Sequence, residues 1–364
     1  MSKFQVRGAS RPAFLLLLMV LPLAAAPPAG DPSALPSESM PRASKSLLLD
    51  VVKSSAGYFA VGERGHVLKS GDGESWTQVS TPTRSTLTTI TTVDGQLWAG
   101  GHDGVILHSA DGGATWQAQR QDPFLLAAGQ NPADHDPRQG APILDIHFSD
   151  ASNGIAVGAY SLMLVTHDGG GSWTPKQAIA GASAAPAARA PMEGDIFSEQ
   201  DLQLDEESDP HLNAVTSAGD GALVIVGERG TVLRSTDRGE TWQKLAFPYK
   251  GSMFGVLDLG QGRLLAYGLR GNVYESPDLG SSWSKIDTRG STSLMGGVAL
   301  ANGGALLTGA NGTVLSRATA NTPFAVTTFK NANGETPALA GILPIGDGNN
   351  VLVGDKGVDL FHLQ

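Results

Sequence analysis

One phrase recurs along this chain and sets its architecture. It reads "VGERGHVLKSGDGESW" at 61–76 and "VGERGTVLRSTDRGETW" at 226–242, and weaker copies bring the number of units to seven. Successive anchoring glycines are 39, 57, 69, 41, 41 and 45 residues apart. A basic period of about 40 residues, with short apolar runs and no 3.6-residue periodicity, is typical of repeats of four short strands. The anchoring glycines are Gly62, Gly101, Gly158, Gly227, Gly268, Gly309 and Gly354.

The repeat predicts an all-β fold, a seven-bladed β-propeller of four-stranded antiparallel blades. The 47 glycines, which follow no collagen period, fit many tight turns. We expect the propeller to span 31–364, with insertions at about 119–142 and 175–211. The seventh unit ends after its third strand, so residues near 36–46 are expected to add the missing N-terminal strand and close the ring.

The second half of the phrase matches the Asp-box, Ser/Thr-x-Asp-x-Gly-x-x-Trp, in four units, and the first unit has a fifth box that is one residue shorter between Asp72 and Trp76. An aspartate in such a turn accepts backbone N–H bonds, glycine permits a positive φ, and the tryptophan packs between blades. We therefore assign these residues a structural role, because a feature repeated in many units is usually architecture. The residues are Asp72, Asp111, Asp168, Asp237 and Asp278, with Trp76, Trp116, Trp173, Trp242 and Trp283.

The first half of the phrase lies in the turn between the second and third strands, on the face opposite the Asp-boxes. Both insertions join one blade to the next and emerge on that same face, as loops that carry binding sites on rigid scaffolds do. We predict partner binding there through residues two positions after the anchoring glycine. The alternative is that Arg64 and Arg229 only pair with Glu63, Glu228 or solvent. The predicted partner-binding residues are Arg64, Tyr160, Arg229, Arg270 and Lys356.

The insertions carry no recognisable metal or cofactor motif, and we expect none of either. In "NPADHDPRQGAP", His135 stands between Asp134 and Asp136, whose side chains point apart and converge poorly on one metal. The acidic segment "MEGDIFSEQDLQLDEESDP" at 192–210 lacks the ligand spacing of a calcium loop. It is either a solvating loop or a segment that covers the basic turns or a partner.

The N-terminal segment indicates the cellular location, and the net charge limits the classes of partner. Lys3, Arg7 and Arg11 precede an apolar run from 13 to 23, which predicts a signal peptide within 1–30, cleaved between about 24 and 34. The run is too short to span a membrane, and the chain has no cysteine. The net charge of -10 disfavours nucleic acid. We expect a monomer in a bacterial periplasm or equivalent lumen.

The pattern "VGxxGxVLxSxDxGxxW" resembles the photosystem II stability/assembly factor family, seven-bladed propellers within the wider Asp-box class. The resemblance covers about 46 to 364 and implies a non-catalytic lumenal or periplasmic scaffold. Such a scaffold binds membrane-protein intermediates through a surface rich in arginine, to which Arg64, Arg229 and Arg270 would contribute. Both insertions depart from the plain family pattern.

Two rival functions remain open. An Asp-box glycosidase such as a sialidase uses an arginine cluster and paired acids, for which Glu63, Asp103 and Glu228 are candidates. The chain lacks the Arg-Ile-Pro motif of sialidases. A glycosidase needs a deep pocket with two carboxyls about 5 to 9.5 Å apart, whereas a scaffold uses a broad basic surface. The other rival is an accessory protein of an envelope transporter or secretion complex.

Overall fold

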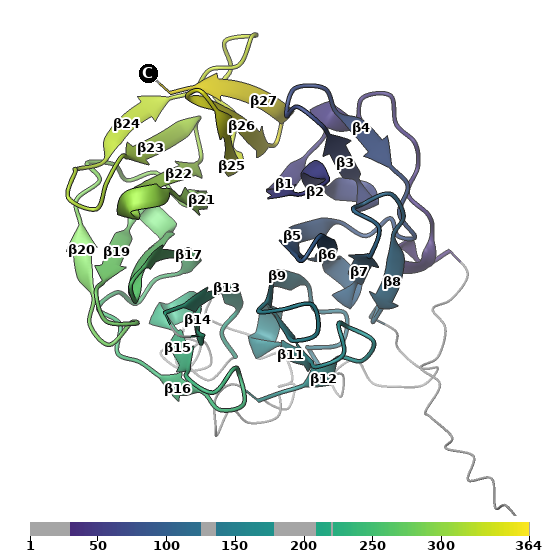
Figure 1. Cartoon of the computed structure of the whole chain (residues 1–364), viewed down its shortest axis with the longest axis horizontal. Coiled ribbons are helices and arrows are strands. Elements are labelled where there is room, and N and C mark those ends of the chain that lie inside the picture. The colour runs from purple at the N-terminus through teal and green to yellow at the C-terminus, as the bar shows by residue number, and fades with distance from the viewer. Residues whose placement is uncertain (1–29, 125–135, 178–208, 220, 364) are drawn as a thin grey trace, which may run out of the picture.

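A computed structural model describes residues 30–124, 136–177, 209–219 and 221–363, which form a ring of seven antiparallel sheets (Figure 1). The predicted all-β seven-bladed propeller is confirmed. The first strands of neighbouring blades contact one another around the ring and so surround its centre. We call the strands of each blade a to d from the centre outward. The expected signal peptide, His135 and nearly all of the acidic segment lie outside the described residues.

The strand bounds follow the apolar runs of the repeat. The a strands are β1 (Leu48–Ser54), β5 (Leu87–Val93), β9 (Ile143–Phe148), β13 (Leu212–Ala218), β17 (Met253–Gly260), β21 (Leu294–Ala299) and β25 (Leu339–Gly346). The b strands are β2 (Gly57–Gly62), β6 (Gln96–Gly101), β10 (Gly154–Gly158), β14 (Ala222–Gly227), β18 (Arg263–Gly268), β22 (Ala305–Gly309) and β26 (Asn349–Gly354). The c strands are β3 (Val67–Ser70), β7 (Ile106–Ser109), β11 (Met163–Thr166), β15 (Val232–Ser235), β19 (Val273–Ser276), β23 (Thr313–Arg317) and β27 (Gly357–His362).

The d strands are shorter and more exposed than the inner strands. They are β4 (Thr77–Val79), β8 (Gln117–Arg120), β12 (Thr174–Pro175), β16 (Gln243–Lys244), β20 (Ser284–Ile286) and β24 (Ala325–Thr328). The helical elements described are 3₁₀ turns, at Pro32–Ala34, Ala43–Lys45, Glu63–Gly65, His102–Gly104, Ala159–Ser161, Glu228–Gly230, Leu269–Gly271 and Ala301–Gly303. Among the residues described, no helix is long and apolar enough to cross a membrane.

The hydrophobic core is divided into clusters that lie between consecutive blades. In one cluster, Val157 and Met163 of the third blade pack with Leu212 and Ile225 of the fourth, and Trp242 covers them. Trp116 lies in the same way between the first and second blades, against the cluster that holds Phe59. Each blade therefore buries its apolar surface mainly against its neighbours, as expected for a stacked repeat.

The anchoring glycines are explained by a close approach of two backbones. Gly227 has an extended backbone, with φ -160° and ψ -155°, so its backbone conformation does not require glycine. A Cβ atom at this position would lie 2.2 Å from the carbonyl oxygen of His211, just before the a strand of the same blade. The other six anchoring glycines meet the corresponding carbonyl oxygen at 2.0–2.4 Å. A side chain at any of them would push the b strand away from the entry of the a strand.

The predicted closing strand is wrong. The seventh sheet has the three strands β25, β26 and β27, and residues 36–46 add none. Instead, the turn Ala43–Lys45 packs against β27, and Lys45 Nζ donates to the carbonyl of Val358 at 2.9 Å. Pro36 and Pro41 interrupt this segment, and proline cannot donate to a strand ladder. The seam between the last and first blades is therefore closed by a turn and side-chain contacts.

Candidate functional site

The turns between the b and c strands hold their side chains in a strained backbone conformation. We call the side of the ring that carries these turns the glycine-turn face. In six blades the residue two positions after the anchoring glycine has φ between 54° and 57°. This left-handed conformation costs a non-glycine residue about 1–2 kcal/mol. The residues are Arg64, Asp103, Tyr160, Arg229, Arg270 and Asn311. Six side chains therefore project from one face, and at five of them, all but Asn311, asparagine or glycine would suit the backbone better.

Lys356 is presented differently from the other predicted residues. The seventh blade joins its b and c strands by the tighter turn Asp355–Lys356, flanked by the paired Gly354 and Gly357. Lys356 Nζ lies 3.6 Å from Glu335 Oε1, and both side chains are about half exposed. Lys356 thus belongs to the same face but is already paired with an acid.

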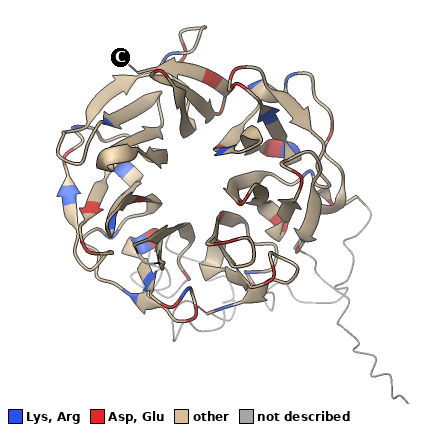
Figure 2. Cartoon of the chain, in the orientation of Figure 1, with Lys and Arg blue, Asp and Glu red and all other residues tan. Residues whose placement is uncertain are grey.

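The predicted partner-binding residues surround the ring and do not form one patch. Arg229 and Arg270 lie on the neighbouring fourth and fifth blades, whereas Arg64 lies on the first. Figure 2 shows lysines and arginines distributed around the ring. Arg64 and Arg270 are exposed, and the charge of Arg229 acts on the nearby Asp209. Tyr160 is 42% exposed, and its ring lies edge-on to His211 with centroids 5.1 Å apart.

The fifth blade adds two cations that the repeated phrase does not contain. Arg270, Lys285 and Arg289 line one hollow of about 620 Å³, together with Asp287. Arg289 also has a left-handed backbone, with φ 54°. Sequence analysis missed Lys285 and Arg289 because they lie in the d strand and in the connection after it. They place three cationic side chains around one hollow beside the glycine turn of the fifth blade.

The Asp-boxes occupy the opposite face, which we call the Asp-box face. Asp237 shows their chemistry: its carboxylate accepts bonds from Ser235 Oγ at 2.7 Å, Thr241 N at 2.9 Å and Thr241 Oγ1 at 2.5 Å. The Thr241 hydroxyl and N–H lower the pKa of Asp237 to about 2. Asp72, Asp111, Asp168 and Asp278 accept equivalent bonds from Ser or Thr and from backbone N–H groups.

The tryptophans of the boxes differ in their hydrogen bonds. The indole N–H groups of Trp76, Trp242 and Trp283 donate to a carbonyl of their own turn at 3.0–3.1 Å. Those of Trp116 and Trp173 are buried without a partner. The rings occupy equivalent places between blades, so packing positions them and the indole bond is secondary.

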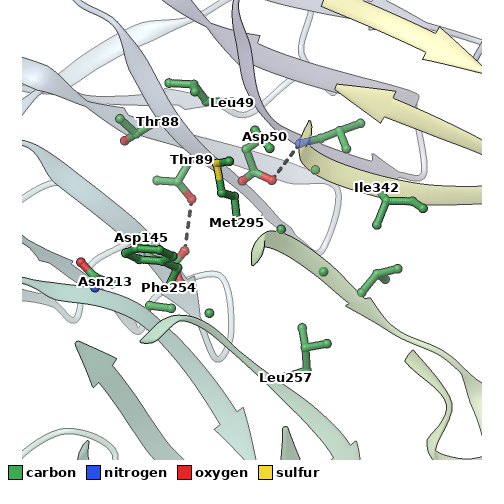
Figure 3. A pocket seen from close by; sticks show the side chains of 18 of the residues that line it. Leu49, Asp50, Thr88, Thr89, Asp145, Asn213, Phe254, Leu257, Met295 and Ile342 are labelled. Atoms are coloured by element: carbon green, nitrogen blue, oxygen red, sulfur yellow. Dashed lines mark hydrogen bonds between the residues drawn. The ribbon is translucent and has the colours of Figure 1, made fainter. Parts of the chain in front are cut away.

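A polar pocket of about 350 Å³ lies at the centre of the ring, where the a strands begin (Figure 3). Asp50 and Asp145 line it, with Thr89 on the blade between them. Asp50 Oδ2 accepts from Ile90 N at 2.8 Å, and Asp145 Oδ2 accepts from Val215 N at 2.9 Å, so each carboxyl ties its blade to the next. The a strands begin beside the anchoring glycines, which places the pocket at the glycine-turn face.

Both carboxyls have raised pKa values. Burial raises the pKa of Asp50 to about 6, against the effect of its backbone hydrogen bonds. Burial also raises the pKa of Asp145 to about 7, and the charge of Asp50 adds to this. Sequence analysis missed both residues. The available signal was a broken repeat, because the equivalent positions in the fourth to seventh blades hold Ala214, Gly255, Gly296 and Gly341.

The described residues contain no group of three or more His, Cys, Asp or Glu side chains placed to hold a metal ion. The acids proposed for a glycosidase, Glu63, Asp103 and Glu228, do not line the central pocket. Asp103 instead accepts a bond from Ser85 Oγ at 2.5 Å, and Glu228 accepts from His211 N at 3.1 Å. The glycine-turn face therefore combines a cationic rim with a central acidic pocket.

Comparison with known proteins agrees with the repeat and the fold. The BNR/Asp-box repeat family matches residues 233–244. A structure of YCF48 from Cyanidioschyzon merolae superposes with a TM-score of 0.59 at 16% identity, covering 87% of this chain and 96% of that one. A structure of YCF48 bound to D1 peptide gives 0.59 at 15% identity, covering 88% and 94%. The WD40 propeller of Doa1 gives 0.61 at 13% identity, covering 92% and 97%.

No curated protein matches the sequence. At 13–16% identity, the solved structures show that the fold is shared. The Asp-box match adds the repeat type. The resemblance to the photosystem II stability/assembly factor family is confirmed in repeat and architecture. The chain is a seven-bladed β-propeller that matches the BNR/Asp-box repeat at residues 233–244 and is similar in fold to YCF48.

Proposed function

We propose that this protein is a non-catalytic scaffold that binds a membrane-protein or envelope-complex partner on its glycine-turn face. The observation that carries the proposal is the set of arginines at strained left-handed positions, Arg64, Arg229 and Arg270. Residues held in such conformations cluster at binding and switch sites, which motivates the proposal. The structure of YCF48 bound to D1 peptide supports peptide binding by a propeller of this fold.

The charge distribution favours a partner segment with carboxylate groups. The net charge of the chain is -10, which repels acidic partners in general, so an acidic segment would bind where arginines locally outweigh the acids. The hollow lined by Arg270, Lys285 and Arg289 offers guanidinium groups, which pair with carboxylates in bidentate geometry. Electrostatic binding of this kind weakens as salt increases.

We propose a periplasmic or lumenal location, which rests on the basic and apolar stretch within residues 1–30. The partner would then be the exposed loop or terminus of a membrane protein on that side of the membrane. Fusion of residues 1–40 to a reporter active only after export tests the location, and a reporter without activity would contradict it.

The test of partner binding compares arginines on the two faces. Wild type and an Arg64→Glu, Arg229→Glu, Arg270→Glu variant are used to capture proteins from solubilised membranes of the native host. The captured segment is then synthesised, and its affinity is measured by calorimetry at low and high salt. We expect the triple variant to bind about tenfold more weakly or worse. Equal affinity of wild type and variant would exclude this face as the interface.

Arg238 provides a matched control. It is exposed and left-handed, with φ 61°, but it lies in the Asp-box turn of the fourth blade. Arg238→Glu changes the same charge in the same backbone conformation on the other face. We expect it to leave partner affinity unchanged, and circular dichroism checks that all variants are folded.

A glycosidase has one observation in its favour, the paired carboxyls of the central pocket. Against it, both oxygens of Asp50 and of Asp145 accept backbone N–H bonds. No arginine lines the pocket to hold a substrate carboxylate. We therefore favour the scaffold, and hydrolysis of an aryl glycoside that is lost in Asp145→Asn would reverse this choice.

A further inference from the structure

The central pocket differs from the rest of the glycine-turn face in the sign of its charge. It is lined by the first residues of all seven a strands, and no lysine, arginine or histidine is among them. Asp50, Thr89 and Asp145 form one side of it, and Thr89 Oγ1 donates to Asp145 Oδ1 at 3.1 Å. Leu257, Met295 and Ile342 also line the pocket (Figure 3). The pocket thus pairs acceptor groups with an apolar wall.

Tyr267 supplies an independent sign of a ligand. It lies on β18 opposite Gly255, lines the pocket, and is 5% exposed. A Cβ on Gly255 would lie 2.2 Å from the Tyr267 hydroxyl, so the missing side chain of the a strand makes room for this ring. Among the described residues the hydroxyl has no hydrogen-bond partner, and the charges of Asp50 and Asp145 both act on it. The hydroxyl is not among the enclosed polar atoms that lack a partner, so it faces the pocket, and its hydrogen-bond partner is water or a ligand bound there.

These groups break the symmetry of the ring together. The positions equivalent to Tyr267 in the second, fourth and seventh blades are Gly100, Val226 and Val353. An aspartate stands at the position of Asp50 and Asp145 in two blades, and small residues stand there in the fourth to seventh blades. The propeller architecture, which is common to all seven blades, does not require two aspartates and a tyrosine at these positions.

We propose that the central pocket binds an alkylammonium group, held by Asp50, Asp145 and the Tyr267 hydroxyl, with its hydrocarbon chain against the apolar wall. An ammonium group has three donors and no acceptor, which matches two carboxylates and a phenolic oxygen. The cation supplies a countercharge to Asp145, whose ionisation is disfavoured by burial and also by the charge of Asp50. The site is distinct from the cationic rim and stands independently of partner binding there.

Other ligand classes fit less well. An anion would meet two carboxyls and no cation. A bare divalent ion needs six or more oxygen ligands for calcium or a near-octahedral shell for magnesium, whereas each carboxyl oxygen here already accepts a backbone N–H bond. A volume of about 350 Å³ lies within the range of small organic ligands.

The probe is n-butylammonium, titrated into the folded protein by calorimetry at pH 8, with n-butanol as the uncharged control. We expect the cation to bind at or below about 1 mM and butanol to show no comparable heat. No binding of the cation up to about 50 mM, or equal binding of butanol, overturns the proposal.

Tyr267→Phe is the most informative variant because it removes a hydroxyl that makes no internal hydrogen bond. We expect unchanged stability and about fivefold weaker binding of n-butylammonium. Asp145→Asn should weaken binding about tenfold or more, at some loss of stability, because its amide cannot accept both N–H bonds. Asp103→Asn, on the same face but outside the pocket, is the control and should bind as wild type. Full affinity in Tyr267→Phe and Asp145→Asn would show that the amine binds elsewhere.

Two sources can supply this chemistry, a free amine or the lysine side chain of a docked polypeptide. The tripeptide Ac-Gly-Lys-Gly-NH2 separates them. Affinity at least equal to that of n-butylammonium identifies a lysine side chain as an admissible occupant, and much weaker affinity identifies a free amine. Affinity should increase from pH 6 to pH 8, because Asp50 and Asp145 are the carboxyls lining the pocket and both ionise over this range, while Tyr267 stays neutral.

Discussion

The aspartates of the two faces of this ring have the same side chain and opposite behaviour. On the Asp-box face, Asp72, Asp168 and Asp237 are exposed in tight turns, and hydrogen bonds lower their pKa values to about 2. In the central pocket, burial raises the pKa values of Asp50 and Asp145 to about 6 and about 7. The first set recurs in blade after blade and stabilises turns. The second set is confined to two blades and carries an unbalanced charge, which is where ligand chemistry is expected.

On the glycine-turn face, too, a residue that is repeated in every blade differs in role from residues that vary between blades. The anchoring glycine is required in all seven blades by a backbone contact, whereas the residue two positions later is Arg, Asp, Tyr, Asn or Lys. The repeated glycine therefore serves the architecture, and the variable position is where we propose partner recognition. Substitutions at the two kinds of position should have separable effects on stability and on binding.

The largest expected effect is that of Gly227→Ala. Its Cβ would lie 2.2 Å from the His211 carbonyl oxygen, and backbone cannot move aside as a side chain can. We expect a loss of about 3 kcal/mol or more in the free energy of unfolding, measured by urea denaturation. Gly71→Ala is the control, because its Cβ would meet no atom within 4 Å, and it should change stability by less than about 0.5 kcal/mol. Equal stability of the two variants would contradict the claim that the close backbone contact requires a glycine at this position.

The parts of the molecule that sequence analysis predicted are those that depend on local pattern. The seven units, the strands around 212–247 and the five Asp-boxes all follow from residues close together in the chain. The central pocket was missed because Asp50, Asp145 and Tyr267 are adjacent only after the ring closes. The closing strand was predicted from the need to complete the seventh blade, but residues 36–46 form no strand and the seventh sheet has three strands. Residues that come together only when the ring closes are visible in the sequence only as departures from the repeat.

An intermediate effect is expected from Ser235→Ala on the Asp-box face. The Ser235 hydroxyl is buried, donates to Asp237, and accepts from the buried Gly239 N–H at 2.8 Å. Its removal leaves that N–H without a partner, which costs about 1–3 kcal/mol. We expect a lower melting temperature with unchanged affinity for n-butylammonium and for the partner segment. A change in either affinity with stability preserved would assign a binding role to the Asp-box face and reverse the comparison.

The smallest expected effect is the contribution of the two pocket carboxyls to the pH dependence of stability. Because the folded pKa values of Asp50 and Asp145 lie above the ordinary aspartate value of 3.8, these groups favour the folded state when protonated. That contribution is lost as pH rises through about 6 and 7. Between pH 6 and pH 8 we expect a loss on the order of 1 kcal/mol, measured by denaturation at each pH. The Asp-box carboxyls, ionised throughout this range, contribute nothing to it.

Asp145→Asn separates the pocket from the other titrating groups. Burial lowers the pKa values of His66, His108 and His147, so these side chains act in the opposite direction, and they are unchanged in the variant. The difference in slope between wild type and variant therefore reports Asp145. We expect the variant to lose less stability from pH 6 to pH 8, and saturating n-butylammonium to reduce the slope of wild type. Identical slopes would mean that Asp145 does not titrate between pH 6 and pH 8. The carboxyl in the central pocket would then be ionised throughout this range, as Asp237 is, and the two sets of aspartates would differ only in position.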